Sequence, residues 1–285
     1  MSDKDLVFYL YLIEGYSFKN CINIAKNQSQ YICLELSPKG VTIKYINKKS
    51  YAVHEIAIKS SKLLDYKYEF LDSDGKLLPY YHLFVESEIL LNNMKNITKK
   101  ESALCISYKK DQDYIILNPP KNSNNNIRYS SQSVNLINKE KMKISTTFKH
   151  ICTIKMQTKD FADICNQVKN IKCESLEIVG YNNVIRFRGI HNYIKDNYEM
   201  IYFSSYNSMD QKEYLKQKNN IENEKSITNI KIPVELVKLM SKIHNISTVH
   251  SITKIYYDSK SIKIKFPIGN YGKYIIYISK KNEPK

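Results

Sequence analysis

The sequence repeats itself at half its length, and this repeat restricts the fold more than any other feature. The stretch FKNCINIAKNQSQYICLELSPKGVTIKY, residues 18–45, is matched by FADICNQVKNIKCESLEIVGYNNVIRFR, residues 161–188, at an offset of 142 to 143 residues. Each stretch begins with a helix-like spacing of apolar residues and continues into two alternating segments separated by a turn. In a chain of 285 residues, this pattern predicts two copies of one folding unit, each of about 140 residues.

Matched helices stand near the start of each copy. Apolar residues at i, i+3, i+4 and i+7 predict a helix over 16–27 in the first copy and one over 159–170 in the second. These residues are Phe18, Cys21, Ile22 and Ala25, and then Phe161, Ile164, Cys165 and Val168. Weaker patterns predict a further helix in each copy, over 86–97 and 233–244.

Alternating apolar and polar residues predict strands around these helices. In the first copy the strands span 6–14, 31–37, 41–46, 51–59, 66–71, 80–85, 103–108 and 113–117, and in the second they span 149–156, 174–179, 184–189, 198–205, 227–232, 252–257, 261–266 and 273–278. Each copy therefore runs strand, helix, several strands, helix, several strands, which indicates an α+β fold. The polar stretch 121–145 is the expected linker, and 206–226 is expected to be an exposed loop.

The charge balance points to a polyanionic partner. Forty-four basic residues against 28 acidic residues give a formal net charge of +16. Such an excess favours nucleic acid first and an acidic membrane surface second. The alternative is the Lys-rich composition of an AT-rich genome combined with solubility.

Several classes of function lack their sequence signals. The six cysteines show no C-x-x-C spacing and are expected to be reduced core residues of a cytosolic or nuclear protein. The six histidines are scattered, and the chain has no phosphate loop, nucleophile elbow or H-E-x-x-H motif. We therefore expect no enzyme activity, no cofactor and no metal. No apolar run is long enough to span a membrane, and LVFYLYLI near the N-terminus is too short and too alternating for a signal peptide.

The repeated segments resemble PCNA, the sliding-clamp family of DNA replication. The resemblance rests on IKMQTKDFADICNQVKNI, ESLEIVGYNNVIRFRG, LELSPKGVTIKYINKKSYAVHEIAI and KYIIYISKKN. It covers nearly the whole chain in order, with insertions near 70–80 and 206–226, and it departs at Ser279-Lys280, where the family usually has Ala-Pro. It implies two repeated clamp domains of the α+β class, with helices lining an inner face and antiparallel sheets outside. The implied divisions are an N-terminal clamp domain over 1–133, an interdomain connector over 134–147 and a C-terminal clamp domain over 148–285.

The resemblance also implies that double-stranded DNA is bound, independently of its sequence, by lysines on the helices. Lysine contacts to phosphate carry no base information and weaken with salt. The matching positions are Lys19, Lys26, Lys95, Lys169, Lys238 and Lys242. A solvated helix face is the alternative for each of them. Asp163 and Asn166 depart from the family, which commonly has Arg there, and Glu88 and Glu235 also lie on the polar faces.

A second implied site is a groove that takes peptide motifs of DNA polymerase and other clients. An aromatic and aliphatic plug fills an apolar pocket in this kind of recognition, and flanking residues add a strand. The matching positions are Ile46, Tyr51, Met142, Ile144, Pro233, Tyr277 and Ile278. Ordinary strand packing is the alternative for the last two, whereas Met142 and Ile144 are apolar residues in a polar connector.

The leading interpretation is a DNA sliding clamp, a homotrimeric ring that serves DNA replication and DNA repair in the nucleus. Edge strands over 127–133 and 198–205 would pair head to tail to close such a ring. Two alternatives stay open: a basic protein of the same fold that holds DNA as a monomer or dimer, as a viral processivity or transcription factor, and a subunit of a heterotrimeric checkpoint clamp. The high Lys, Asn and Ile content is compatible with a large DNA virus, for which the location would be a cytoplasmic replication site.

Overall fold

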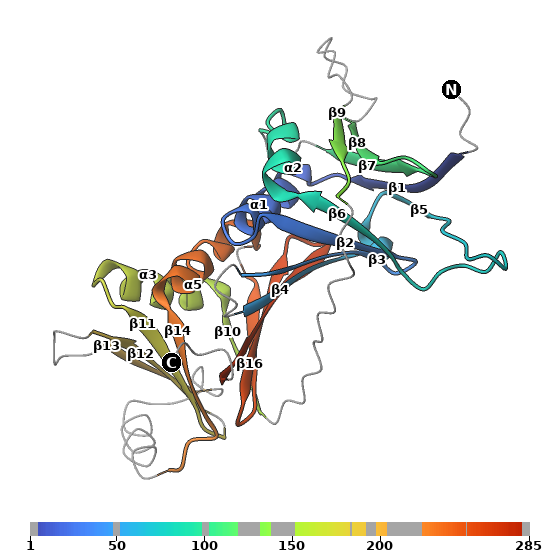
Figure 1. The fold of residues 1–285 in the computed structure, drawn as a ribbon. Helices are drawn as coiled ribbons and strands as arrows, with labels where there is room; N and C mark the ends of the chain where they lie inside the picture. The colour runs from blue at the N-terminus through green and yellow to red at the C-terminus, as the bar shows by residue number, and fades with distance from the viewer. Residues whose placement is uncertain are drawn as a thin grey trace. The chain divides into compact units, whose positions relative to one another are not determined.

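The chain forms two compact units in a computed structural model that describes residues 5–47, 52–98, 103–118, 132–137, 152–182, 184–191, 198–203, 224–248 and 250–280. The first unit comprises Met1–Ser145 with Ile268–Tyr274, and the second comprises Thr146–Pro267 with Ile275–Lys285. Both units are of the α+β class, as predicted, with paired helices and antiparallel sheets (Figure 1).

Two antiparallel sheets and two helices build the first unit. Its elements are β1 (Leu6–Leu12), α1 (Gly15–Lys26), β2 (Tyr31–Ser37), β3 (Gly40–Ile46), β4 (Ala52–Lys59), the short 3-10 helix η2 (Ser60–Lys62), β5 (Asp65–Tyr68), β6 (Tyr81–Glu86), α2 (Ser87–Asn93), β7 (Leu104–Lys109), β8 (Tyr114–Asn118) and β9 (Gln132–Asn135). One sheet has the strand order β5-β1-β7-β8-β9, and the other contains β4-β3-β2-β6. Helices α1 and α2 pack against each other.

The second unit has the same plan. Its elements are β10 (Cys152–Gln157), α3 (Thr158–Asn170), β11 (Ser175–Gly180), β12 (Val184–Ile190), β13 (Tyr198–Phe203), β14 (Thr228–Pro233), α5 (Val234–Met240), the 3-10 helix η4 (Ile243–Ile246), β15 (Ile252–Tyr257), and most of β16 (Ser261–Ile268) and of β17 (Gly272–Ser279). One sheet has the order β13-β12-β11-β14, and the other contains β10-β15-β16-β17. Helices α3 and α5 pack against each other.

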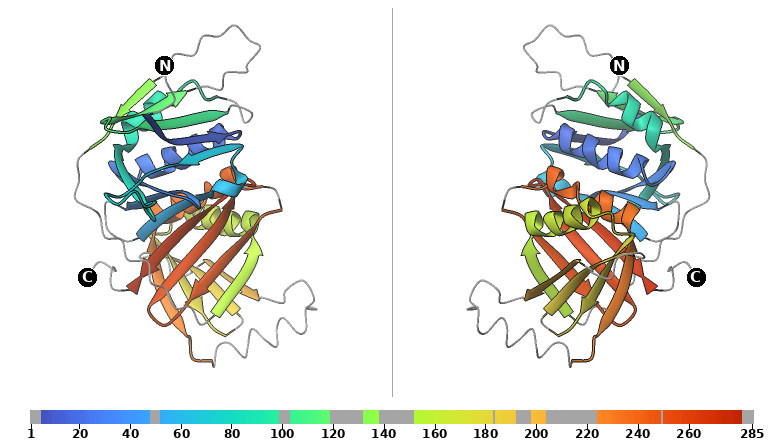
Figure 2. Two further views of the ribbon diagram at one scale, coloured as in Figure 1. Left: turned by 90° about the vertical axis from the view of Figure 1, so that its right-hand side faces the viewer. Right: turned by 90° about the vertical axis from the view of Figure 1, so that its left-hand side faces the viewer.

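Strand order proves the repeat at the level of topology. In the first unit β1-β7-β8-β9 and β4-β3-β2-β6 correspond in chain order to β10-β15-β16-β17 and β13-β12-β11-β14 in the second. Strand β5 is an addition, with no counterpart among the described strands of the second unit. Figure 2 shows α1 and α3 each lying across the strands of its own unit. The repeat inferred from sequence is thus a repeated fold.

Each long helix buries the apolar residues that predicted it. Phe18, Cys21, Ile22 and Ala25 of α1 and Phe161, Ile164, Cys165 and Val168 of α3 are all at most 1% exposed. The Phe161 ring lies 6.0 Å from that of Phe187 on β12 and 5.4 Å from that of Phe266 on β16. Phe161 therefore ties α3 to both sheets of the second unit.

A polar cluster is enclosed in the core of the first unit. The hydroxyl of Tyr274 lies 2.7 Å from His54 Nδ1 and 2.7 Å from the Tyr45 hydroxyl. The rings of His54 and Tyr45 stack at 4.6 Å, and all three side chains are fully buried. Burial lowers the pKa of His54 from 6.5 to about 3, so the ring is neutral in the folded protein.

The turn between β2 and β3 requires its glycine. Gly40 has φ +132°, and a Cβ there would lie 2.0 Å from the carbonyl oxygen of Ile58. Only glycine combines that backbone conformation with so close an approach. The turn predicted between the strands over 31–37 and 41–46 thus fixes the hairpin, in which Ser37 pairs with Gly40.

Element ends differ from the predictions in specific places. Strand β9 occupies 132–135, so the expected connector 134–147 begins inside a strand: Val134 is fully buried, and Ile137 N–H donates to Phe84 O at 2.9 Å. The helices expected over 86–97 and 233–244 are shorter, because α2 ends at Asn93 and α5 at Met240. Pairing with β8 sets the bounds of β9, which overlaps the end of the edge strand expected over 127–133 and extends two residues beyond it.

The cysteines match their prediction. All six are buried and none forms a disulfide. Burial raises the pKa of the thiols of Cys21 and Cys33 to about 12, so these groups stay protonated and unreactive. No helix in the described part of the chain is long and apolar enough to cross a membrane.

Candidate nucleic-acid interface

The predicted DNA-binding lysines lie on or beside the two helix pairs. Lys19 and Lys26 are on α1, and Lys95 follows α2. Lys169 is on α3, Lys238 is on α5, and Lys242 follows α5. Lys19, Lys26, Lys169 and Lys238 thus lie on helices as expected, whereas Lys95 and Lys242, expected within helices, lie beyond the helix ends.

Two lysines of the first unit are engaged within the protein. Lys19 Nζ donates to Ile97 O at 2.8 Å and to Lys95 O at 3.2 Å, just beyond the C-terminal end of α2. A cation near helix carbonyls stabilises that helix end, and partial burial lowers the pKa of Lys19. Lys26 Nζ lies 3.0 Å from Glu88 Oε1 of α2. Both side chains thus hold α1 and α2 together, and less of their charge is directed at solvent.

The predicted lysines of the second unit are more exposed to solvent than Lys19 and Lys26. Lys169, Lys238 and Lys242 are exposed, as is Lys95 in the first unit. Exposed carboxylates stand on the same helices, among them Asp163 on α3. Burial and the neighbouring Asp163 raise the pKa of Asp160, which is a sign of crowded negative charge at this end of α3.

The helices carry little of the chain's positive charge. Helix α1 has two lysines and no acid, α2 has one glutamate, α3 has two lysines and two aspartates, and α5 has one lysine and one glutamate. In the described part of the chain, helices α1, α2, α3 and α5 together therefore contribute +1 to a total of +16, and Lys95 and Lys242 raise this to +3. The helix faces are therefore a candidate DNA-binding surface with a small net positive charge.

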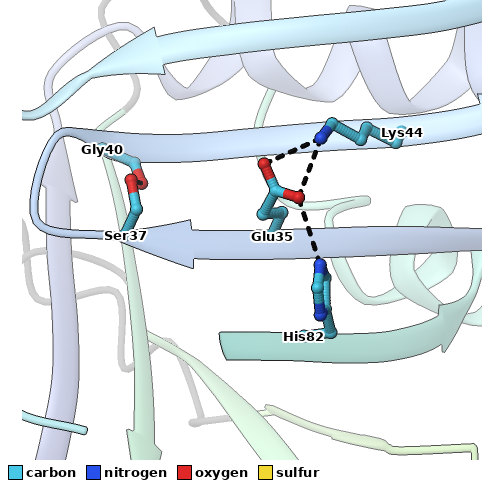
Figure 3. A network of polar contacts seen from close by, with 5 residues as sticks. All are labelled: Glu35, Ser37, Gly40, Lys44 and His82. Carbon is cyan, nitrogen blue, oxygen red and sulfur yellow. Dashed lines mark hydrogen bonds and ion pairs between the residues drawn. The ribbon is translucent and has the colours of Figure 1, made fainter. Parts of the chain in front are cut away.

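A polar network on β2, β3 and β6 was not foreseen (Figure 3). Both carboxylate oxygens of Glu35 accept hydrogen bonds from Lys44 Nζ at 2.8 Å, and Glu35 Oε2 lies 3.1 Å from His82 Nε2. Burial alone would raise the pKa of Glu35, but the bonds from Lys44 and His82 outweigh it and the pKa lies below its usual value. The network joins three strands on the sheet face opposite the core. Glu35 and Lys44 lie on the two strands of one hairpin, whereas His82, 47 residues from Glu35, joins them only through the register of β2 with β6.

The predicted client groove is described only in part. Tyr51, Met142 and Ile144 lie outside the described residues. Ile46 is half-buried at the end of β3, and Tyr277 is half-buried on β17. Pro233 is the last residue of β14 and the N-cap of α5, one position before the expected first turn.

Ile278 does not belong to an outer groove. Neighbouring strand residues point to opposite sheet faces, and Ile278 is 4% exposed in the core, whereas Tyr277 is on the other face. The sequence alternation of β17 contained this information, because the two residues are adjacent.

Each unit has a sheet edge where a partner strand could add. Strand β9 ends the order β5-β1-β7-β8-β9, and β13 ends the order β13-β12-β11-β14. The expected edge strand over 198–205 is β13, whereas most of the one over 127–133 lies outside the described residues. Edge strands present backbone groups that can pair with another chain. Among the described residues, no group of three or more His, Cys, Asp or Glu could hold a metal ion.

Comparison with solved structures identifies the fold. The chain is similar to a chain of the PCNA2–PCNA3 complex from Sulfolobus tokodaii, with a TM-score of 0.69 and 14% identity over 96% of this chain and 100% of that chain. It is also similar to the Proliferating Cellular Nuclear Antigen of Entamoeba histolytica, with a TM-score of 0.70 and 11% identity over 96% and 98% of the two chains. No protein-family profile matches the sequence, and no curated protein matches it. The protein therefore has the PCNA-like sliding-clamp fold.

Proposed function

We propose that this protein is a sliding clamp, a ring-forming processivity factor that keeps DNA polymerase and other replication or repair enzymes on duplex DNA. The observation that carries the proposal is the clamp fold across 96% of the chain, with the same strand order in both units. The location follows from the role: the nucleus, or a cytoplasmic replication site if the source is a virus.

Ring closure would use the two edge strands. A contact between different faces of identical subunits closes a ring when the rotation fits. Pairing of β9 in one copy with β13 in the next would cover both edges. A homotrimer would have a mass of about 100 kDa, since one chain has 33.5 kDa.

DNA contact in the ring would fall mainly to the exposed lysines. Lys95, Lys169, Lys238 and Lys242 are the exposed members of the predicted set. Lys19 and Lys26 would act indirectly, by fixing α2 against α1. Weak and sequence-independent phosphate contacts suit a protein that has to slide.

Client peptides would bind beside Tyr277 and Ile46, the described members of the predicted groove. Strand addition supplies main-chain hydrogen bonds in such recognition, and a few aromatic anchors supply most of the affinity. Tyr51, Met142 and Ile144 would complete the groove.

The mass in solution at physiological salt tests the proposal. A particle of about 100 kDa supports the homotrimer, whereas one of 33.5 kDa supports the monomeric DNA-holding alternative. The low helix charge favours that alternative over a ring that relies on its helices alone. A monomer that assembles only with a second clamp chain would support the heterotrimeric alternative, and one similar structure is itself a complex of two PCNA chains.

A further inference from the structure

One sheet face of the second unit is strongly basic. In β10-β15-β16-β17 the core side is formed by fully buried residues such as Ile154, Ile255 and Ile264. On the opposite side, Lys155 of β10 faces Lys254 of β15, and Lys254 faces Lys265 of β16. Directly opposed residues in an antiparallel pair share one sheet face. Three lysines therefore form a row across three strands, which we call the lysine row.

The charged residues in these four strands are all lysines. The four strands contain Lys155, Lys254, Lys263, Lys265 and Lys273, and neither Asp nor Glu. They contribute +5, against +1 from the described helices α1, α2, α3 and α5. The nearest acid in the β15–β16 hairpin, Asp258, accepts hydrogen bonds from Lys260 N and Ser261 N of its own turn.

The shared fold does not require these charges. In the first unit the topologically equivalent strands β1, β7 and β8 contain one charged residue, Lys109. The other sheet of the second unit also differs, because Arg188 lies 3.2 Å from Glu199 and 3.6 Å from Glu177. The lysine row is thus a feature of this one face and not of clamp units or of the chain's composition in general.

The row places three positive charges close together, because neighbouring strands are only about 4.7–4.9 Å apart. Positive charges at that spacing attract a polyanion. The row spans two strand spacings, roughly 10 Å, a length over which duplex DNA presents about six phosphate charges at one per ~1.7 Å.

The tyrosines beside the row favour duplex over single-stranded DNA. Lys263 Nζ lies 5.8 Å from the ring centre of Tyr256 and 5.1 Å from that of Tyr277. Single-strand platforms need open aromatic faces on which bases stack, and here an ammonium group already stands over both rings. Phosphate contact needs only the ammonium groups and hydroxyls.

We propose that the lysine row and Lys263 form a second DNA-binding surface, which holds the phosphate backbone of duplex DNA on a sheet face, apart from the helices. The surface lies wholly within the second unit and requires no ring. Its failure is therefore distinguishable from failure of the proposed clamp function.

The test is the salt dependence of binding to a 30-bp duplex. Each lost phosphate contact lowers the slope of log K against log salt by about 0.9. The triple variant Lys155→Gln, Lys254→Gln, Lys265→Gln should therefore lower it by about 2.7. The matching Lys→Arg triple should keep the original slope. A control triple, Lys62→Gln, Lys76→Gln, Lys110→Gln, removes the same charge from exposed positions of the first unit and should leave the slope within about half a unit.

Three outcomes would overturn the proposal. An unchanged slope in the lysine-row triple would show that DNA does not contact this face. An equal loss in the control triple would show that only the net charge matters. Loss of binding to a polyglutamate probe, with duplex binding intact, would assign the face to an acidic peptide instead of DNA.

Discussion

The buried His54 should make the first unit sensitive to mild acid. Its pKa is about 3 in the folded protein against 6.5 for an ordinary histidine. Between these values the unfolded chain binds a proton that the folded chain excludes, so stability rises with pH across this window. When the pH is lowered from 7 to 5, His54 should lower the free energy of unfolding by about 2 kcal/mol. Well below pH 6.5, each further pH unit lowers it by ~1.4 kcal/mol.

The matched variant is His54→Phe. A phenyl ring can keep the stack on Tyr45 and leaves Tyr274 its hydrogen bond to the Tyr45 hydroxyl. It also removes His54 Nε2, a buried nitrogen without a hydrogen-bond partner. The variant should therefore fold and lose the acid sensitivity that His54 confers.

The assay is urea unfolding of both proteins at pH 7, 6 and 5. The difference between wild type and variant isolates His54, because the other histidines are common to both. We expect the variant to gain about 2 kcal/mol relative to wild type between pH 7 and pH 5. Parallel pH curves for the two proteins would refute the reasoning and show that His54 is accessible to protons in the folded state.

Three further predictions concern the helices, the core and the groove. Lys19→Met should lower the free energy of unfolding by about 1 kcal/mol and leave the salt slope of duplex binding unchanged. The double variant Lys238→Gln, Lys242→Gln should lower that slope by about 2 units. Equal slopes for the two variants would contradict this. Phe161→Ala should cost about 3–5 kcal/mol in chemical unfolding because Phe161 joins α3 to both sheets, while Ile171→Ala, at a residue that is 46% exposed, should stay within about 0.5 kcal/mol. Tyr277→Ala should lower the affinity for a fluorescent polymerase-derived peptide about tenfold, or ~1.4 kcal/mol. An unchanged affinity would show that Tyr277 is not part of the groove.

Sequence periodicity was sufficient for most of the fold. The repeat, the two long helices and the order of strands followed from where apolar residues recur, because burial of one face is what positions each element. Phe18 and Phe161 are each buried on the long helix of their own unit. Strand β9 overlaps only the end of the edge strand expected over 127–133, because the register of its pairing with β8 sets its bounds.

The candidate site was predicted less completely, for physical reasons that the local sequence cannot express. A helical pattern shows that Lys19 lies on a polar face, but not that the end of α2 supplies carbonyl groups within 3.2 Å. The pairing of Lys26 with Glu88 depends on how two helices pack. The lysine row likewise appears only once strand register aligns Lys155, Lys254 and Lys265, which are spread over 111 residues of sequence.

Retention on DNA of different topology tests the clamp proposal most directly. The protein is assembled on a nicked circular plasmid, challenged with salt that abolishes phosphate contacts, and then the plasmid is cut once. A ring that encloses the duplex should stay on the circle at high salt and leave after linearisation, because no contact but the closed ring holds it. Release from the intact circle at the same salt as from linear DNA would contradict the account and leave surface binding as the only mode.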